Sequence, residues 1–137
     1  MLMEENNMVS VWIGRAEDEE KVDALMDYVY DEDGDAIPPE FLQFSGIDDI
    51  YIDEDFVEVS FQESTHSLTS LLEEHSYSNY FLPELLQRFD DQLTEKVNIA
   101  LLIYHFEFNG AVSDVTLDGI QMFYLGAVPF EKEDLYT

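Results

Sequence analysis

The stretch YVYDEDGDAIPPEFLQFSGIDDIYIDEDFVEVSF, from Tyr28 to Phe61, places dense acidic clusters beside runs of large apolar residues. No Lys or Arg occurs from Val22 to Gln87. Carboxylates this dense cannot all be buried, because an unpaired buried charge costs too much free energy. They must therefore lie on the surface and create a strong negative field there. The two clusters are Asp31, Glu32, Asp33 and Asp35, followed by Asp48, Asp49, Asp53, Glu54 and Asp55.

The whole chain shares this acidity. Its 137 residues include 32 acidic and 5 basic ones, so the formal net charge is −27, while hydrophobic residues make up 46%. The length predicts a single domain over residues 1–137, and the apolar content is sufficient for a folded core. The charge argues against nucleic acid or an anionic membrane as partner, because both carry phosphate. It favours a partner with a basic surface.

The compartment is predicted from what the sequence lacks. There is no cysteine, which excludes disulfides and thiol chemistry. The first residues, MLMEENNM, have neither the basic region nor the apolar run of a signal peptide. No stretch approaches the ~20 apolar residues of a membrane-spanning helix. We expect a cytoplasmic protein.

The N-terminal half outside the clusters predicts short alternating elements. Met8–Gly14 is typical of a buried strand, with Trp12 in the core. Apolar residues at helical spacing predict a helix over Glu17–Tyr30. Asp31–Ile37 should then be a loop. After Pro38-Pro39 we expect a helical turn that buries Phe41, Leu42 and Phe44 and ends at Gly46. We then expect Ile50–Ile52 and Phe56–Phe61 to form a pair of strands, with a turn at Asp53-Glu54-Asp55 between them.

The second half predicts helices followed by strands. Ser67–His75 should be a helix with Ser67 as its N-cap, and Pro83 suits the first turn of another helix, whose apolar stripe would reach Val97. Three apolar runs follow, over Ile99–Phe108, Ala111–Leu117 and Ile120–Val128. The turn dipeptides Asn109-Gly110 and Asp118-Gly119 separate them, which is typical of an antiparallel meander. The predicted fold class is α+β: an antiparallel or mixed sheet with a C-terminal β-meander and about three helices packed mainly on one face.

Catalytic and metal-binding motifs are weak. With Gly34 at position 6 of an EF-hand loop, Asp31, Asp33 and Glu40 fit ligand positions, but Val29 falls at position 1 and cannot ligate. A weak divalent-cation site in the acidic loops stays open as an alternative. His66, His75 and His105 share no ligand spacing, and neither a G-x-S-x-G motif nor a Gly-rich phosphate loop occurs. We expect no catalytic residue, no cofactor and no enzyme activity.

Five ordered segments resemble a known family. They are VSVWIG (9–14), YDEDGD with IPPEF (30–41), DEDFVEVSF (53–61), SYSNYFLPEL (76–85) and FYLGAVPF (123–130). Together they resemble the immunity protein 22 family, small bacterial proteins of polymorphic toxin loci. The resemblance implies that the protein neutralises a cognate toxin, and it assigns no binding residues.

The acidic surface and this resemblance lead to one hypothesis for the partner. Toxins that are nucleases need basic clefts to hold phosphate, and an acidic inhibitor would be steered onto such a cleft. The alternative is an acidic DNA mimic or regulator that sequesters a basic nucleic-acid-binding protein. The competing interpretation is that the aromatic residues are ordinary core residues and that the acids only keep the domain soluble. The residues predicted to bind the toxin are Tyr30, Asp31, Glu32, Asp33, Asp35, Tyr51, Asp53, Glu54, Asp55, Phe56 and Glu58, with Tyr77 and Tyr80 as further aromatic candidates.

Overall fold

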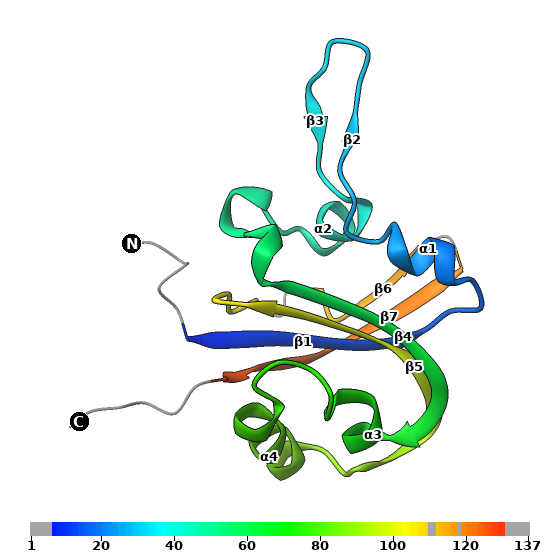
Figure 1. Cartoon of the computed structure of the whole chain (residues 1–137), viewed down its shortest axis with the longest axis vertical. Helices are drawn as coiled ribbons and strands as arrows, with labels where there is room; N and C mark the ends of the chain where they lie inside the picture. The colour runs from blue at the N-terminus through cyan, green and yellow to red at the C-terminus, as the bar shows by residue number, and fades with distance from the viewer. Residues whose placement is uncertain (1–6, 110–111, 118, 131–137) are drawn as a thin grey trace, which may run out of the picture.

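A five-stranded sheet forms the centre of the molecule. The computed structural model describes residues 7–109, 112–117 and 119–130. The strand order is β4-β5-β1-β7-β6, and every neighbouring pair is antiparallel. The strands are β1 (Met8–Arg15), β4 (Val57–Ser67), β5 (Gln92–Tyr104), β6 (Asp114–Leu117) and β7 (Ile120–Pro129). A separate hairpin of two short strands, β2 (Val29–Tyr30) and β3 (Ala36–Ile37), projects from this body (Figure 1).

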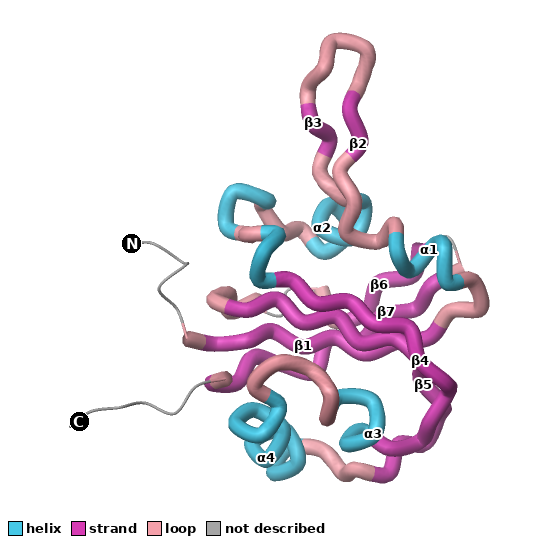
Figure 2. The backbone as a smooth tube through the Cα atoms, viewed as in Figure 1, coloured by secondary structure: helices cyan, strands magenta, loops and turns pink. Residues whose placement is uncertain are grey.

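Helices cover both faces of the sheet. Helices α1 (Glu19–Asp23) and α2 (Glu40–Ser45) lie on one face, and α3 (Leu68–Leu72) and α4 (Ser78–Arg88) lie on the other (Figure 2). The α+β class is confirmed, but the expectation of helices mainly on one face is wrong. The physical reason lies in β5, whose unbroken apolar run Ile99–Tyr104 is buried on both sides and must be covered on both.

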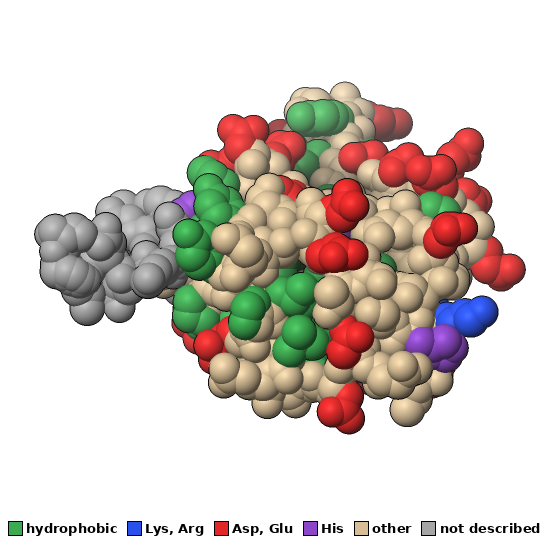
Figure 3. All heavy atoms as spheres, turned by 60° about the horizontal axis from the view of Figure 1, so that its bottom comes forward, with side chains coloured by type: hydrophobic (Ala, Val, Ile, Leu, Met, Phe, Trp, Pro, Cys, Tyr) green, Lys and Arg blue, Asp and Glu red, His purple; other side chains and the backbone are tan. Residues whose placement is uncertain are grey.

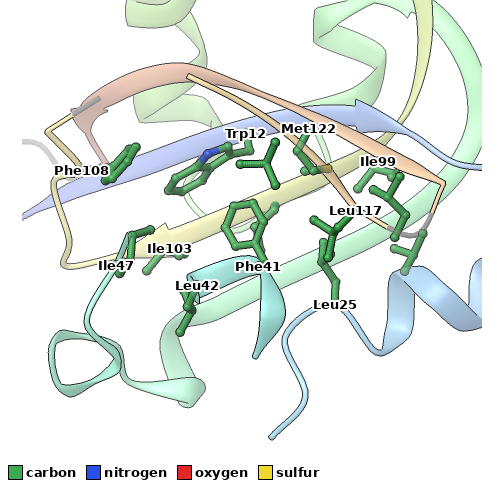
Figure 4. Packing of buried hydrophobic residues seen from close by; sticks show 14 of the residues in the cluster. Trp12, Leu25, Phe41, Leu42, Ile47, Ile99, Ile103, Phe108, Leu117 and Met122 are labelled. Atoms are coloured by element: carbon green, nitrogen blue, oxygen red, sulfur yellow. The ribbon is translucent and has the colours of Figure 1, made fainter. Parts of the chain in front are cut away.

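Trp12 belongs to the core on the α1–α2 face, as its sequence context predicted. Its ring contacts Phe41 of α2 edge-on, with centroids 5.2 Å apart, and also packs against Phe108 and Tyr124 (Figure 4). The opposite core forms where alternate residues of β1 and β5 meet α3 and α4. Gly14 allows β1 to lie close to β7, because a Cβ atom there would overlap the Gln121 carbonyl oxygen.

The predicted pairing of the last two strands is confirmed, but the predicted pairing of the strand before them with β6 is wrong, because β1 and β7 lie between β5 and β6. Strands β6 and β7 form a hairpin in which Leu117 pairs with Ile120, and Gly119 has φ +82°. Strand β1, from the start of the chain, lies between β5 and β7. Gly110 and Asp118, which complete the two predicted turn dipeptides, lie outside the described residues.

Several predicted element boundaries are wrong. The helix predicted over Glu17–Tyr30 ends at Asp23, because Val29 and Tyr30 pair with β3 instead. The helix around Pro83 begins earlier, at Ser78, and ends at Arg88, so that Leu93 and Val97 belong to β5. The N-cap of α3 is confirmed, since the Ser67 hydroxyl accepts a hydrogen bond from the Ser70 N–H.

Two further corrections concern the acidic stretch. Phe44 was expected inside, but its side chain is 55% exposed. The strand pair predicted for Ile50–Ile52 and Phe56–Phe61 does not form. Residues Asp49–Tyr51 and Glu54–Phe56 are 3-10 turns (η2 and η3), and β4 begins at Val57 and pairs with β5. Asp48 and Asp53 cap these turns, which favours them over extended strands.

Candidate partner-binding face

Asp31 shapes the tip of the projecting hairpin. Its Oδ1 atom accepts hydrogen bonds from the backbone N–H groups of Asp33 and Asp35, both at 2.9 Å, and Gly34 takes a positive φ of 84°. This arrangement is an Asx turn, in which an aspartate side chain replaces a backbone acceptor. The carboxylates of Glu32, Asp33 and Asp35 make no hydrogen bond or ion pair within the described residues, so their charge faces solvent.

Asp48 and Asp53 organise the second acidic segment in the same way. Asp48 Oδ1 accepts from the Ile50 N–H at 3.1 Å, and Asp53 Oδ1 accepts from the Asp55 N–H at 3.0 Å. Two short 3-10 turns follow one another, and such tight turns cannot bury every side chain. They leave Ile50 75% exposed and Tyr51 and Phe56 partly exposed.

Tyr28 joins the base of the hairpin to this second segment. Its hydroxyl donates to Asp49 Oδ2 at 3.2 Å. Partial burial, with a further contribution from this hydrogen bond and the charge of Asp49, raises the pKa of Tyr28 to about 12. An open groove of about 560 Å³ lies at this junction, lined by Tyr28 and residues 50–55. The fold therefore joins the base of the hairpin to the second acidic segment, while the first acidic cluster lies at the projecting tip (Figure 1).

Exposed apolar side chains concentrate on the same region. Among the described residues, seven of the ten exposed large hydrophobic residues lie between Val29 and Phe56. We call this region the acidic face and define it by the residues predicted from sequence: Tyr30, Asp31, Glu32, Asp33, Asp35, Tyr51, Asp53, Glu54, Asp55, Phe56 and Glu58. All of them lie on the hairpin, the 3-10 turns or the start of β4, and Glu58 is the least exposed of its acids.

The prediction from sequence missed four apolar members of this surface. Val29 and Ile37 pair with each other in the hairpin, Phe44 lies in the last turn of α2 and Ile50 lies in η2. All four side chains are exposed. A groove of about 700 Å³ opens at the base of the hairpin, with Val29 and Ile37 in its lining. Val29 stands at helical spacing and Phe44 has apolar neighbours, and both patterns predict burial. Only the three-dimensional fold identifies these residues as exposed.

Arg15 and Lys96 lie away from the acidic face, whereas Lys21 lines the groove at the base of the hairpin. Arg15 pairs with Glu95 and donates to Gln121 Oε1 at 2.7 Å, and Lys96 lies beside it at the far ends of β1 and β5. Figure 3 shows Asp and Glu side chains across one face of the molecule and Lys or Arg only at its edge. The hairpin tip and the 3-10 turns contain no Lys or Arg of their own, so the field around their carboxylates is strongly negative.

The acids and histidines considered as ligands have other roles in the fold. The carboxylate oxygens of Asp31, Asp33 and Asp35 lie within 4.8 Å of one another, but they belong to a β-hairpin rather than to a helix–loop–helix. His66 Nδ1 lies 3.0 Å from the Leu93 carbonyl oxygen, and His75 Nε2 lies 2.9 Å from Ser60 Oγ. The described residues contain no helix of the length and apolarity needed to cross a bilayer.

Comparison with known proteins gives a family and no individual relative. No curated protein and no solved structure matches the chain. The family model described as Immunity protein 22 matches residues 9–131, which include the whole described sheet except Met8 and all of the acidic face. The resemblance noted from five sequence segments is thereby confirmed, and the chain belongs to the Immunity protein 22 family.

Proposed function

We propose that this protein neutralises a cognate toxin by covering it with the acidic face, and that the toxin is a nuclease with a basic cleft. Membership of an immunity-protein family supports inhibition of a toxin in general. The observation that carries the proposal is the concentration of exposed apolar residues among unpaired carboxylates between Val29 and Phe56. Interfaces combine such a hydrophobic centre with a charged rim, and large exposed apolar patches mark them.

The mechanism is binding rather than catalysis. The projecting hairpin carries Glu32, Asp33 and Asp35 at its tip, where they would attract a phosphate-binding cleft before contact. Aromatic side chains such as Tyr30, which is 68% exposed, would then supply most of the affinity. We place this encounter in the bacterial cytoplasm, where a nuclease meets its substrate.

Co-expression with the toxic domain encoded beside the gene tests the proposal. We expect restored growth and a stable complex of the two proteins. Tyr51→Ala should weaken the complex by about tenfold or more, as for an aromatic anchor. Leu86→Ala is the control, because Leu86 is an exposed apolar residue that lies on α4, outside the acidic face. A lack of both protection and complex would refute the proposal.

A second measurement separates this function from DNA mimicry. A DNA mimic recognises many basic nucleic-acid-binding proteins through its charge, whereas an immunity protein selects one partner. We expect binding to an unrelated basic DNA-binding protein to be far weaker than binding to the toxin at physiological salt. Equal affinities would favour the mimic.

A further inference from the structure

A small aromatic pocket adjoins the acidic face at one edge of the sheet. Its volume is about 210 Å³. Four separate segments supply its lining, because the start of β4 lies beside the end of β5, and β7 ends nearby (Figure 1). The lining residues are Asp55, Phe56, Glu58, Ser76, Tyr77, Tyr104, His105 and Phe130. None of these segments predicts a pocket by its own sequence.

The rings of this pocket pack around Phe130. The ring centroids of Tyr77, Tyr104 and His105 lie 5.1, 5.0 and 5.1 Å from that of Phe130, and Phe56 contacts His105 at 4.6 Å. Phe56 and Tyr77 are nevertheless partly exposed, with Tyr77 at 49%. The pocket therefore presents aromatic surface to a partner instead of closing it into the core.

Unusual backbone conformations hold two of these rings in place. Tyr77 has φ 65° and His105 has φ 61°, and they are the described residues other than glycine with positive φ. Bulky residues rarely adopt this conformation, and where they do the surrounding structure enforces it, often at functional sites. Glycine would fit the backbone of either position better but would remove a ring from the pocket.

Two carboxylates supply negative charge to the pocket. Glu58 accepts hydrogen bonds from the Ser76 N–H at 3.1 Å and from the Ser76 hydroxyl. Glu58 Oε1 also lies 3.4 Å from the Tyr104 hydroxyl, so of the roughly four acceptor positions of this carboxylate the free one lies on Oε2. Tyr104 donates its hydroxyl proton to the Ser76 carbonyl oxygen at 2.6 Å. No Lys or Arg lines the pocket, so within the described residues the charges of Asp55 and Glu58 have no cationic partner there.

We infer that this pocket binds a single arginine side chain of the toxin. A guanidinium group stacks on aromatic rings and forms paired hydrogen bonds to a carboxylate, which a lysine ammonium does not. Small-molecule sites usually span about 300–1,000 Å³, so the size of this pocket suits one side chain better than a metabolite. The inference rests on the proposed function for the identity of the partner, and it adds the residue type that the partner supplies.

The isolated arginine group tests the pocket without any toxin. N-acetyl-L-arginine amide, titrated into the full chain in an NMR experiment, should shift the resonances of Phe56, Tyr77 and His105. The neutral isostere N-acetyl-L-citrulline amide should not. Glu58→Gln should abolish the shifts, and Glu63→Gln, the same charge change on the same strand outside the pocket, should preserve them.

Three results of this titration would overturn the inference. Shifts spread equally over the acidic loops would indicate unspecific attraction of a cation. Equal shifts from N-acetyl-L-lysine amide would remove the preference for a guanidinium. Self-association through the pocket, seen as resonances that broaden with protein concentration and sharpen in Tyr77→Ala, would make a second copy of this chain the occupant.

Affinity for the toxin tests the same pocket within the complex. Glu58→Gln and Tyr77→Ala should each weaken binding about thirtyfold, the loss typical of a hot-spot residue. Glu63→Gln and Leu86→Ala, the latter at an exposed position of α4, should change affinity less than about twofold. Unchanged affinity in both pocket variants would refute the pocket and leave the proposed function standing. If arginine amide binds and the toxin does not, the proposed function fails and the pocket stands.

Discussion

At the level of single residues, Tyr28 links the two halves of the acidic face. Its ring lies at the base of the hairpin, and its hydroxyl donates to Asp49 of the second acidic segment. A phenol held beside carboxylates resists ionisation, because burial and the nearby negative charge both disfavour the phenolate. The pKa of this one side chain therefore reports whether the hairpin and the 3-10 turns are in contact.

The pKa of Tyr28 predicts a loss of stability at alkaline pH. The pKa is about 12 in the folded protein against 10.0 for an unperturbed tyrosine, so the fold favours the neutral phenol. This contribution is complete below about pH 10 and disappears as the pH rises towards 12. The ultraviolet difference titration between the wild type and Tyr28→Phe should show a tyrosine that ionises near 12.

A substitution at the partner residue provides the control. Asp49→Asn should lower the pKa of Tyr28 only in part, because burial is the larger cause and the hydrogen bond the smaller one. If the difference titration instead gave a midpoint near 10, Tyr28 would be exposed in solution and the contact with Asp49 absent. Circular dichroism recorded alongside shows that the chain stays folded over the titration.

At the level of elements, the hairpin and the 3-10 turns divide their acids between two roles. Asp31, Asp48 and Asp53 accept backbone hydrogen bonds that form the turns, so their removal would alter the local structure. Asp49 accepts the hydrogen bond of the Tyr28 hydroxyl. The other acids accept none among the described residues and can act only through their charge. They are Glu32, Asp33, Asp35, Glu54 and Asp55.

This division predicts which acids control association with the toxin. Amide substitution of Glu32, Asp33, Asp35, Glu54 and Asp55 together should slow association roughly tenfold at low salt and flatten its salt dependence, because rim charges act mainly on the on-rate. Stopped-flow kinetics at two salt concentrations measures both effects. The matched control replaces five exposed or half-exposed acids elsewhere, namely Glu63, Glu73, Glu74, Glu84 and Asp90. Equal effects from both sets would mean that only net charge matters.

At the level of the whole molecule, the net charge of −27 opposes the compact state. The described ion pair of Arg15 with Glu95 is exposed, and such pairs add little stability. Stability therefore rests on the two apolar cores, one on each face of the sheet. Salt should relieve the repulsion between carboxylates, since the Debye length falls from about 30 Å at 0.01 M to about 10 Å at 0.1 M.

Thermal unfolding measures this repulsion. Raising NaCl from about 0.01 M to about 0.1 M should raise the midpoint by several degrees, because about 1 kcal/mol shifts the midpoint of a domain this size by roughly 3–5 °C. Sodium sulfate at equal ionic strength is the control, since sulfate also strengthens apolar burial and should stabilise further. A midpoint independent of NaCl would show that the carboxylates are too far apart to repel one another appreciably.

The sequence alone determined the features that depend on local pattern. Apolar runs and turn dipeptides identified the C-terminal strands, and a serine before a helical pattern identified the N-cap at Ser67. Both signals act within a few residues, and together they also gave the α+β class. The absence of Lys and Arg from Val22 to Gln87 identified the acidic surface. Five matching segments identified the family.

Only the tertiary structure decided which segments meet. The insertion of β1 between β5 and β7 depends on long-range pairing. The same pairing places Glu58, Tyr77 and Phe130 around one pocket, although they are far apart in the chain. The end of the helix predicted over Glu17–Tyr30 belongs to a hairpin for this reason too, since Val29 pairs with Ile37. The free energy of such strand pairing comes from contacts between residues that are distant in the chain, so local sequence patterns do not predict it.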